Sequence, residues 1–447
     1  MEAAIPKRAV LDILVVGAGP AGVAAGLEAR RLGLDSLVVD KATFPRDKTC
    51  GDGLTTGALR VLDEIGFDVR ALPSWAAVTD TVLVSPTGRE VEVPLPPDGA
   101  YAGVVPRVEL DAALVEHARA HGVEVLEGAG VTVIDAGDDT VTATLADGTE
   151  VTARFVVAAD GHWSPVRRMI GAESATPLGS WHAFRQYFTG VDDRRLWVLF
   201  EEDLLPGYAW VFPVGAPGER RANVGFGVLR ASTSKGADGP SGKALAAQWR
   251  SLVERPSIRR ALGPDAKPEG TVRAWPIPAA YDRDRLTHGR VLFAGDAGNV
   301  VDPMTGEGIA QAIETGLLAA RAIAASPSHA SSPFDATSVA ARYRADVDRE
   351  LGADLRFASL LQHVLRVPLG ARAAIRTASL TPWTRRNFAR WMWEDYPRAL
   401  LLTPKRWHRR MFEPSPAYSN VHVPDGTAVN IDVPDGTGSL HSTDGPH

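Results

Sequence analysis

Residues 10–22 read VLDILVVGAGPAG, and this stretch decides the fold. Its first seven residues are mostly apolar and rich in β-branched side chains, which predicts a buried parallel strand. The pattern Gly-x-Gly-x-x-Gly then opens an alanine-rich helix that we expect to end at Arg31, before Gly33. A second apolar strand is predicted at 37–40. This order of elements predicts a parallel α/β unit that binds a ligand at the glycine turn.

Each glycine of the pattern has a physical role in holding a dinucleotide. Gly17 allows a tight turn, Gly19 lets a pyrophosphate approach the backbone, and Gly22 allows the helix to pack closely on the strand. The start of the helix supplies unpaired N–H groups and a partial positive charge for the phosphates. Asp40 ends the second strand, where a carboxylate can accept hydrogen bonds from ribose hydroxyls.

A second glycine-rich element lies far along the chain. Residues 290–297, RVLFAGDA, predict a strand that runs into Gly295-Asp296 and leads to a helix over 306–325. We interpret Glu307 as an acid stabilised by the start of this helix rather than as a catalyst. Two helix starts that converge on one ligand suit a long dinucleotide such as FAD. Asp160-Gly161 ends a third apolar strand, although an ordinary β-turn explains that pair as well.

Composition excludes several classes of protein. The 447 residues carry 48 Lys and Arg against 54 Asp and Glu, a net charge of −6, so a nucleic-acid binder is not expected. The single cysteine, Cys50, rules out a disulfide within the chain and fits a cytoplasmic protein. The 11 histidines form no metal-ligand pattern, and we expect no metal. No stretch is long and apolar enough to predict a transmembrane helix.

The hydrophobic pattern predicts the remaining elements. Helices are expected over 107–121 and 337–366, where apolar residues recur every four positions. Short strands are expected at 123–126, 130–135, 140–145 and 151–158, and the aromatic-rich stretch 181–229 is predicted to be mainly β. Residues 231–242 and 326–336 are expected to be linkers or surface.

The motifs, in this order over residues 12–325, resemble the flavoprotein fold shared by aromatic hydroxylases, flavin halogenases and geranylgeranyl reductases. The resemblance implies an α/β fold with a discontinuous Rossmann-like FAD-binding domain, an inserted, mainly antiparallel β-sheet substrate domain, and a helical C-terminal region. The expected bounds are 1–75, 101–180 and 281–335 for the FAD-binding domain, 76–100 and 181–280 for the substrate domain, 336–412 for the helical region, and 413–447 for an extended tail.

Three segments resemble the geranylgeranyl reductase branch, especially enzymes that saturate the isoprenoid tail of menaquinone. They are FPRDKTCGDGL at 44–54, LPGYAWVFP at 205–213 with NVGFG at 223–227, and PMTGEGI at 303–309. That branch carries a Cys-Gly pair near the flavin ring and lines its cavity with the Tyr-x-Trp-x-Phe-Pro strand. The resemblance implies reduction of C=C bonds in an isoprenoid or polyprenyl substrate by hydride transfer from reduced flavin.

We expect Cys50, Tyr208 and Trp210 to be the catalytic residues. Tyr208 and Trp210 alternate on one face of a strand. Cys50 can donate a proton or pack against the flavin, and the neighbouring cations Arg46 and Lys48 would favour its thiolate. The resemblance adds an FAD contact from Arg107 and a backbone contact with the adenine at Val131. The expected cofactor residues are Gly17, Ala18, Gly19, Pro20, Ala21, Gly22, Asp40, Lys41, Arg46, Cys50, Gly51, Asp52, Gly53, Arg107, Val131, Asp160, Gly295, Asp296, Pro303, Gly306, Glu307, Gly308 and Ile309.

Other functions remain open at this stage. A flavin monooxygenase of the same fold is the nearest alternative, a halogenase is a weaker one, and a flavin-bound sensor without turnover is a third. No second Gly-x-Gly-x-x-Gly pattern is found. NAD(P)H would therefore bind transiently, or a separate electron-donor protein would reduce the flavin.

The segment 381–412 combines tryptophans with eight Lys and Arg residues against two acids. Such a composition suits an anionic membrane surface, and a lipid-like substrate makes peripheral contact with the inner face of the cell membrane attractive. The alternative is a packed C-terminal cap, since Pro382, Pro397 and Pro404 interrupt any amphipathic period.

Overall fold

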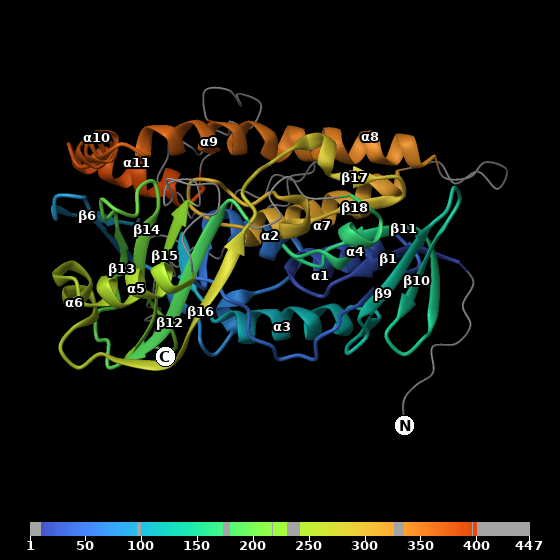
Figure 1. Cartoon of the computed structure of the whole chain (residues 1–447), viewed down its shortest axis with the longest axis horizontal. Helices are drawn as coiled ribbons and strands as arrows, with labels where there is room; N and C mark the ends of the chain where they lie inside the picture. Colours follow the sequence, from blue (N-terminus) through green and yellow to red (C-terminus); the bar gives the residue numbers. More distant parts are fainter. Residues whose placement is uncertain are drawn as a thin grey trace, which may run out of the picture.

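An eight-stranded sheet carries the glycine motif (Figure 1). The computed structural model describes residues 10–95, 100–172, 179–216, 218–229, 242–325, 335–395 and 397–399. The predicted first strand is β1 (Leu11–Val16), which pairs in parallel with β2 (Ser36–Val39) and β11 (Glu150–Ala158). The remaining strands of this sheet are β8 (Val125–Leu126), β9 (Val131–Ala136), β10 (Val141–Leu145), β17 (Thr287–His288) and β18 (Val291–Phe293).

Two helices pack closely above the glycine turn. The first, α1 (Pro20–Arg31), follows the motif as predicted, and α7 (Ile309–Ala324) follows the second glycine element. A Cβ at Gly316 of α7 would lie 2.1 Å from the carbonyl oxygen of Ala21, so only glycine permits this approach. The predicted helix at 107–121 is α3 (Arg107–Ala120). Shorter elements connect these parts: α2 (Thr56–Glu64), α4 (Pro165–Met169) and the 3₁₀ turns Val69–Ala71, Arg283–Arg285 and Gly295–Gly298.

A second sheet of seven strands stands beside the first, as the β-rich prediction for 181–229 requires (Figure 1). Its order is β16-β12-β15-β14-β13-β5-β6. The hairpin β5-β6, from early in the chain, therefore pairs with β13 and extends the sheet formed by the later strands. Both segments expected for the substrate domain, 76–100 and 181–280, contribute strands to this sheet. The exact domain boundaries remain a prediction. The strands are β5 (Asp80–Val84), β6 (Glu90–Pro94), β12 (Trp181–Thr189), β13 (Leu196–Leu199), β14 (Tyr208–Pro213), β15 (Arg221–Leu229) and β16 (Lys267–Ile277).

Smaller elements complete this half of the molecule. A three-stranded sheet of order β3-β7-β4 is formed by short strands that follow β2 and precede β8 in the sequence. Two helices follow β15. Their bounds are β3 (Gly53–Thr55), β4 (Ala76–Ala77), β7 (Ala102–Val104), α5 (Gly242–Val253) and α6 (Pro256–Leu262).

The C-terminal helices run along one side of both sheets (orange to red in Figure 1). The predicted helix over 337–366 is interrupted by a π-helical turn at Asp348–Gly352. It therefore consists of α8 (Ala336–Val347) and α9 (Ala353–Leu365), followed by α10 (Pro368–Ala378) and α11 (Pro382–Met392). Among the described residues, no helix has the length and hydropathy needed to cross a bilayer.

Some predictions fall outside the described residues. They concern the linker residues 231–241, the surface residues 326–334, the part of the basic segment at 400–412 and the tail at 413–447. At the edges of these stretches, α5 begins at Gly242 and α8 begins at Ala336.

Candidate active site

A cavity of about 1050 Å³ extends between the two large sheets and the C-terminal helices. One end is lined by the glycine motif and Asp40, and the middle by residues 46–51 and β14. The other end is lined by α9, α10 and α11. The fold therefore brings together all three segments that resemble the reductase branch, although they lie far apart in the sequence.

The glycine end of the cavity has the geometry expected of a phosphate site. Gly17 has a φ of 106°, and a Cβ at Gly22 would lie 1.7 Å from the Gly17 carbonyl oxygen. A Cβ at Gly19, in contrast, would meet only the Arg46 guanidinium at 3.5 Å, so its backbone is open to a ligand. The Asp40 carboxylate accepts hydrogen bonds from the backbone N–H groups of Ala18 at 2.7 Å and Ala42 at 2.8 Å, which fixes it beside the turn.

Asp160 also lines this end of the cavity and carries an unsatisfied acceptor. Its Oδ2 accepts a hydrogen bond from the Val166 N–H at 3.0 Å, whereas its buried Oδ1 has no partner within the described part of the chain. Burial raises the pKa of Asp160 to about 6. Because a buried polar atom without a partner is unfavourable, this oxygen fits a bound ligand that carries hydroxyl or N–H donors. The residues present therefore fit a dinucleotide such as FAD.

Three cations gather where the phosphates of a dinucleotide would run. Arg107 makes two hydrogen bonds to Asp111, at 2.7 and 2.8 Å, and Arg46 forms an ion pair with the same carboxylate at 3.0 Å. Lys48 lies 3.6 Å from Asp296 and 3.9 Å from the centre of the Trp275 ring. Burial lowers the pKa of Lys48. These contacts hold the segment 46–48 against the cavity wall, as expected from its cations.

Cys50 lines the cavity, but the structure corrects the expectation of a thiolate. Burial raises the pKa of the Cys50 thiol above its ordinary value of 9.0, and this effect outweighs the nearby positive charge of Arg107. Cys50 is therefore protonated near neutral pH. A neutral thiol can pack against a flavin or donate a proton, but it is a poor nucleophile.

Asp52 is buried behind Cys50 and connects the two halves of the molecule. Its backbone has a φ of 64°, which turns the chain sharply after Gly51. Its carboxylate accepts hydrogen bonds from the Tyr187 hydroxyl at 2.6 Å, the Asn223 amide at 2.7 Å and the Arg107 N–H at 3.2 Å. Burial raises the pKa of Asp52, and these hydrogen bonds oppose that effect. Asp52 therefore positions the Cys-Gly segment and does not itself line the cavity.

Aromatic side chains of β14 form one wall of the cavity. Tyr208, Trp210 and Phe212 occupy every second position and lie on the same face, as the sequence predicts. Neighbouring ring centres are 6.1 Å apart. The Trp210 ring lies over Gly225, where a Cβ would come within 2.3 Å of it. The Tyr208 hydroxyl donates a hydrogen bond to the Thr305 carbonyl oxygen, and burial raises its pKa.

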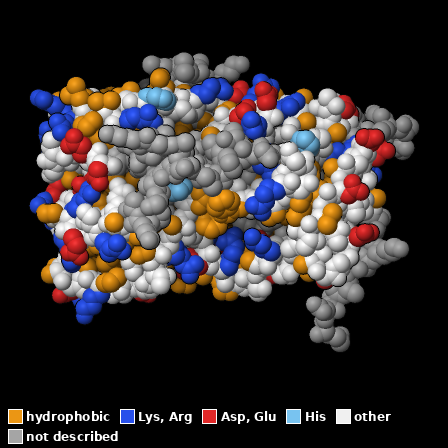
Figure 2. Space-filling view, viewed as in Figure 1, with side chains coloured by type: hydrophobic (Ala, Val, Ile, Leu, Met, Phe, Trp, Pro, Cys, Tyr) orange, Lys and Arg blue, Asp and Glu red, His pale blue; other side chains and the backbone are white. Residues whose placement is uncertain are grey.

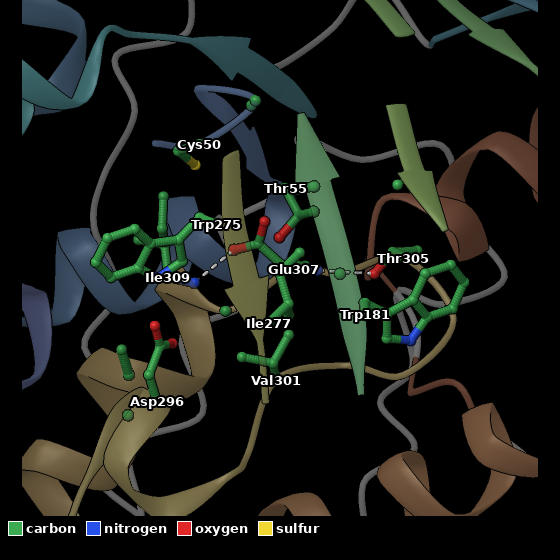
Figure 3. A pocket seen from close by; sticks show the side chains of 18 of the residues that line it. Cys50, Thr55, Trp181, Trp275, Ile277, Asp296, Val301, Thr305, Glu307 and Ile309 are labelled. Carbon is green, nitrogen blue, oxygen red and sulfur yellow. Dashed lines mark hydrogen bonds between the residues drawn. The ribbon is translucent and has the colours of Figure 1, made fainter. Parts of the chain in front are cut away.

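Glu307 lies at the start of α7 and points into the cavity between Trp275 and Trp181 (Figure 3). Its Oε1 accepts hydrogen bonds from the N–H groups of Ile309 at 2.9 Å and Ala310 at 3.3 Å, at the start of the helix. Burial and then the charge of Glu394 raise the pKa of Glu307 to about 8. The carboxyl group is therefore largely protonated at neutral pH, which the sequence did not predict.

The turn after α11 closes the site from behind. Glu394 accepts hydrogen bonds from Thr55 at 2.7 Å and Gln311 at 3.3 Å. Arg398 is buried and forms ion pairs with Asp302 at 2.7 Å and with Glu394 at 3.1 Å. These contacts fix the loop 302–309 from the side opposite the cavity.

The structure places most of the predicted site residues on the cavity wall. Four do not line it: Ala18, Gly22, Asp52 and Pro303. Ala18 and Asp52 act through hydrogen bonds to lining segments, Gly22 acts through packing, and the Pro303 carbonyl oxygen accepts a hydrogen bond from Gln362. Sequence reasoning missed Trp181 and Trp275, which line the cavity, and gave no role to Thr55 or Asp302. It counted Glu394 and Arg398 only as charges of the segment 381–412. The aromatic-rich sequence of β12 was a signal for Trp181, whereas Trp275 is the single aromatic residue of β16 and had no local signal. The other contacts join distant segments.

Known proteins resemble this chain in sequence. The model of the family described as FAD binding domain matches residues 10–342. A menaquinone reductase of Mycobacterium tuberculosis is 37% identical over 332 residues, which cover 69% of this chain and 75% of the relative. A digeranylgeranylglycerophospholipid reductase of Methanopyrus kandleri is 32% identical over 327 residues, which cover 69% and 75% of the two chains.

Solved structures show the same fold. A geranylgeranyl bacteriochlorophyll reductase-like protein from Thermoplasma acidophilum has a TM-score of 0.72 at 21% identity, over 89% of this chain and 99% of that one. A probable FAD-dependent monooxygenase from Pseudomonas aeruginosa has a TM-score of 0.63 at 20% identity, over 83% and 100%. At these identities the likeness shows the fold alone. The match of the family model and of the reductase sequences goes further: this chain belongs to the FAD-binding flavoproteins and, among them, to the geranylgeranyl reductase family of FAD-dependent oxidoreductases.

Proposed function

We propose that this enzyme reduces C=C bonds of a long isoprenoid chain, such as the polyprenyl tail of a quinone or lipid. The observation that carries this proposal is the continuous cavity from the dinucleotide-binding elements to α9–α11. Beyond β14 its lining is mainly apolar or aromatic, with Leu361, Val364, Ile375, Phe388, Trp391 and Met392 beside the polar Thr377, Thr384 and Asn387. An apolar channel of this kind suits a flexible hydrocarbon chain better than a small polar aromatic substrate.

Bound FAD would supply the hydride that is added to one carbon of the double bond. The residues that would hold the cofactor are those of the glycine motif, Asp40, Asp160, Arg46 and the loop 306–309. Their fit rests on the open backbone at Gly19 and the unpartnered Oδ1 of Asp160. We propose that NAD(P)H or a separate electron-donor protein reduces the flavin.

The protein's own residues would orient the substrate and supply the proton. Trp210 is held by a 3.0 Å hydrogen bond from its indole N–H to the Asn223 side-chain oxygen, so its ring forms a fixed wall of the channel. Cys50 and Glu307 are both protonated near neutral pH and both line the cavity. We infer that one of these two groups delivers the proton to the second carbon, while Tyr208 fixes the loop at Thr305.

The decisive experiment incubates the enzyme, reduced anaerobically with NAD(P)H or dithionite, with a polyprenyl quinone dispersed in detergent. Mass spectrometry of a product heavier by two hydrogen atoms supports the proposal. Incorporation of oxygen under air, with no such product, would assign the chain to the monooxygenases instead. Flavin that no substrate reoxidises would favour a sensor.

The described part of the segment 381–412 presents fewer free cations to a membrane than its composition suggests. Of the four arginines of this segment that the structure describes, Arg390 is buried in an ion pair with Asp395, and Arg398 is buried against Asp302. Neither can face a lipid surface. The remaining described arginines lie on α11, where Arg385 is half-buried and Arg386 is exposed.

A further inference from the structure

Exposed apolar side chains gather on the outer side of α9, α10 and the start of α11. Half of the large hydrophobic residues that are exposed in the described part of the chain lie within this short stretch. Their exposed fractions range from 51% at Val364 to 73% at Leu369. Clusters of this kind mark binding surfaces, since single exposed apolar residues are normally scattered. The residues, named here the α9–α11 face, are Leu360, Val364, Val367, Leu369, Leu380 and Trp383.

The stretch of chain that forms this face carries charge of one sign, and the nearby acid Glu202 lies 3.8 Å from Arg372 of α10. Residues 357–393 contain six arginines and no aspartate or glutamate. Arg366, Arg376 and Arg386 are exposed, and none of them forms an ion pair with any described residue. Hydrophobic and basic side chains lie side by side along this edge, at the upper left of Figure 2. An apolar surface with a basic border is complementary to a layer that is apolar inside and anionic at its rim.

The same helices line the cavity with their inner residues. Leu361, Leu365, Ile375 and Ala378 face the cavity, whereas Leu360, Leu369 and Leu380 do not line it. Val364 and Trp383 both line the cavity and remain exposed, at 51% and 65%. These two residues therefore mark a mouth of the cavity within the α9–α11 face.

We propose that the α9–α11 face rests on an anionic lipid bilayer, and that the polyprenyl chain enters the cavity from the bilayer past Val364 and Trp383. The entry route rests on the proposed function, whereas the lipid contact does not. A second copy of the chain is a poorer occupant, because a two-fold contact would place the arginines of this face against one another. Each arginine near the bilayer surface adds attraction that salt weakens, while inserted leucines add attraction that salt leaves intact.

The test is sedimentation of the full chain, loaded with FAD, with vesicles of phosphatidylcholine alone or mixed with phosphatidylglycerol, at low and high salt. We expect binding to the anionic vesicles that weakens at high salt. Leu369→Glu with Leu380→Glu should lower the partition coefficient about ten-fold or more, because both insertion and attraction are lost. Val133→Glu, at an exposed apolar residue of β9 far from this face, is the matched control and should bind as the wild type does.

Several results would overturn the proposal. They are absence of wild-type binding to anionic vesicles, equal loss in the Val133→Glu control, and a double variant that binds normally. A fall in melting temperature of the double variant with unchanged vesicle binding would assign the face to packing within the chain. Activity on substrate in detergent separates the two proposals: vesicle binding without any reduction of polyprenyl substrate leaves the lipid contact intact and removes the proposed function.

Discussion

The side-chain amide of Asn223 on β15 donates a 2.7 Å hydrogen bond to the carboxylate of Asp52, 171 residues earlier in the chain. The same amide donates to the Cys50 carbonyl oxygen at 2.8 Å, and its oxygen accepts from the Trp210 indole at 3.0 Å. One buried side chain therefore fixes the Cys-Gly segment of one half of the molecule against the aromatic wall of the other.

Replacing this amide should loosen the active site and destabilise the fold. In Asn223→Ala, the buried Asp52 carboxylate loses one of its donors and the Trp210 indole N–H loses its acceptor. We expect the free energy of unfolding to fall by about 1–3 kcal/mol and tryptophan fluorescence to report a more mobile ring. Denaturant titration measures the first quantity. Thr132→Ala on β9, which removes an exposed 3.0 Å hydrogen bond to the Thr144 carbonyl oxygen, should change it by less; equal losses in both variants would contradict the argument.

Gly225→Ala tests whether the Trp210 ring needs the bare backbone beneath it. The added Cβ would lie 2.3 Å from the ring and 2.2 Å from the Phe184 carbonyl oxygen, so strand or ring must shift. Overpacking of this kind costs about 1–3 kcal/mol or more, and we expect a lower melting temperature together with weaker turnover. Gly227→Ala is the matched control on the same strand, because its Cβ would meet nothing nearer than 3.9 Å. Similar melting temperatures for the two variants would show that the ring adapts.

Alanine substitutions at two glycines of the cofactor motif should have different effects, one on FAD binding and one on folding. Gly19→Ala places a methyl group in open space at the cavity wall, so we expect a stable protein that loses FAD, measured as the flavin absorbance retained after gel filtration. Gly22→Ala drives a Cβ to within 1.7 Å of the Gly17 carbonyl oxygen, so we expect loss of the fold itself. Full retention of FAD by folded Gly19→Ala would argue against the phosphate position assigned here.

Glu307 should make stability fall as pH rises through a defined window. Its pKa is about 8 in the folded protein against an ordinary 4.5, so between these values the unfolded chain binds fewer protons than the folded chain. Stability from this group is therefore lost progressively from pH 4.5 to 8 and is constant outside that range. In Glu307→Gln this loss is absent. The free energy of unfolding of the variant, relative to that of the cofactor-free wild type, should therefore increase between pH 4.5 and 8, by up to roughly a few kcal/mol. Urea denaturation at a series of pH values measures this difference; a constant difference would refute the raised pKa.

Local sequence signals were sufficient for the glycine turn and the elements on either side of it, but not for α2, α4 or β17. The glycine pattern predicted β1, the turn and α1 because close packing and positive φ leave few alternatives to glycine at 17 and 22. Alternation along 208–213 likewise predicted which side chains of β14 line the cavity. The π-helical turn at 348–352 was missed because the four-residue apolar spacing continues through it. Neither the protonated state of Cys50 nor that of Glu307 was foreseen, since burial sets both and burial depends on distant segments.

The contacts of residues 393–398 also have a consequence for how the protein is made. The Trp393 carbonyl oxygen accepts a hydrogen bond from the Thr56 N–H at 2.8 Å, and Arg398 holds Asp302 beside the loop at the start of α7. Thr56 is synthesised early and Arg398 late, so the loop 302–309 of a nascent chain lacks this ion pair until Arg398 has been added. Premature termination between residues 309 and 393 therefore yields a product whose glycine motif is complete but whose loop 302–309 lacks these supporting contacts.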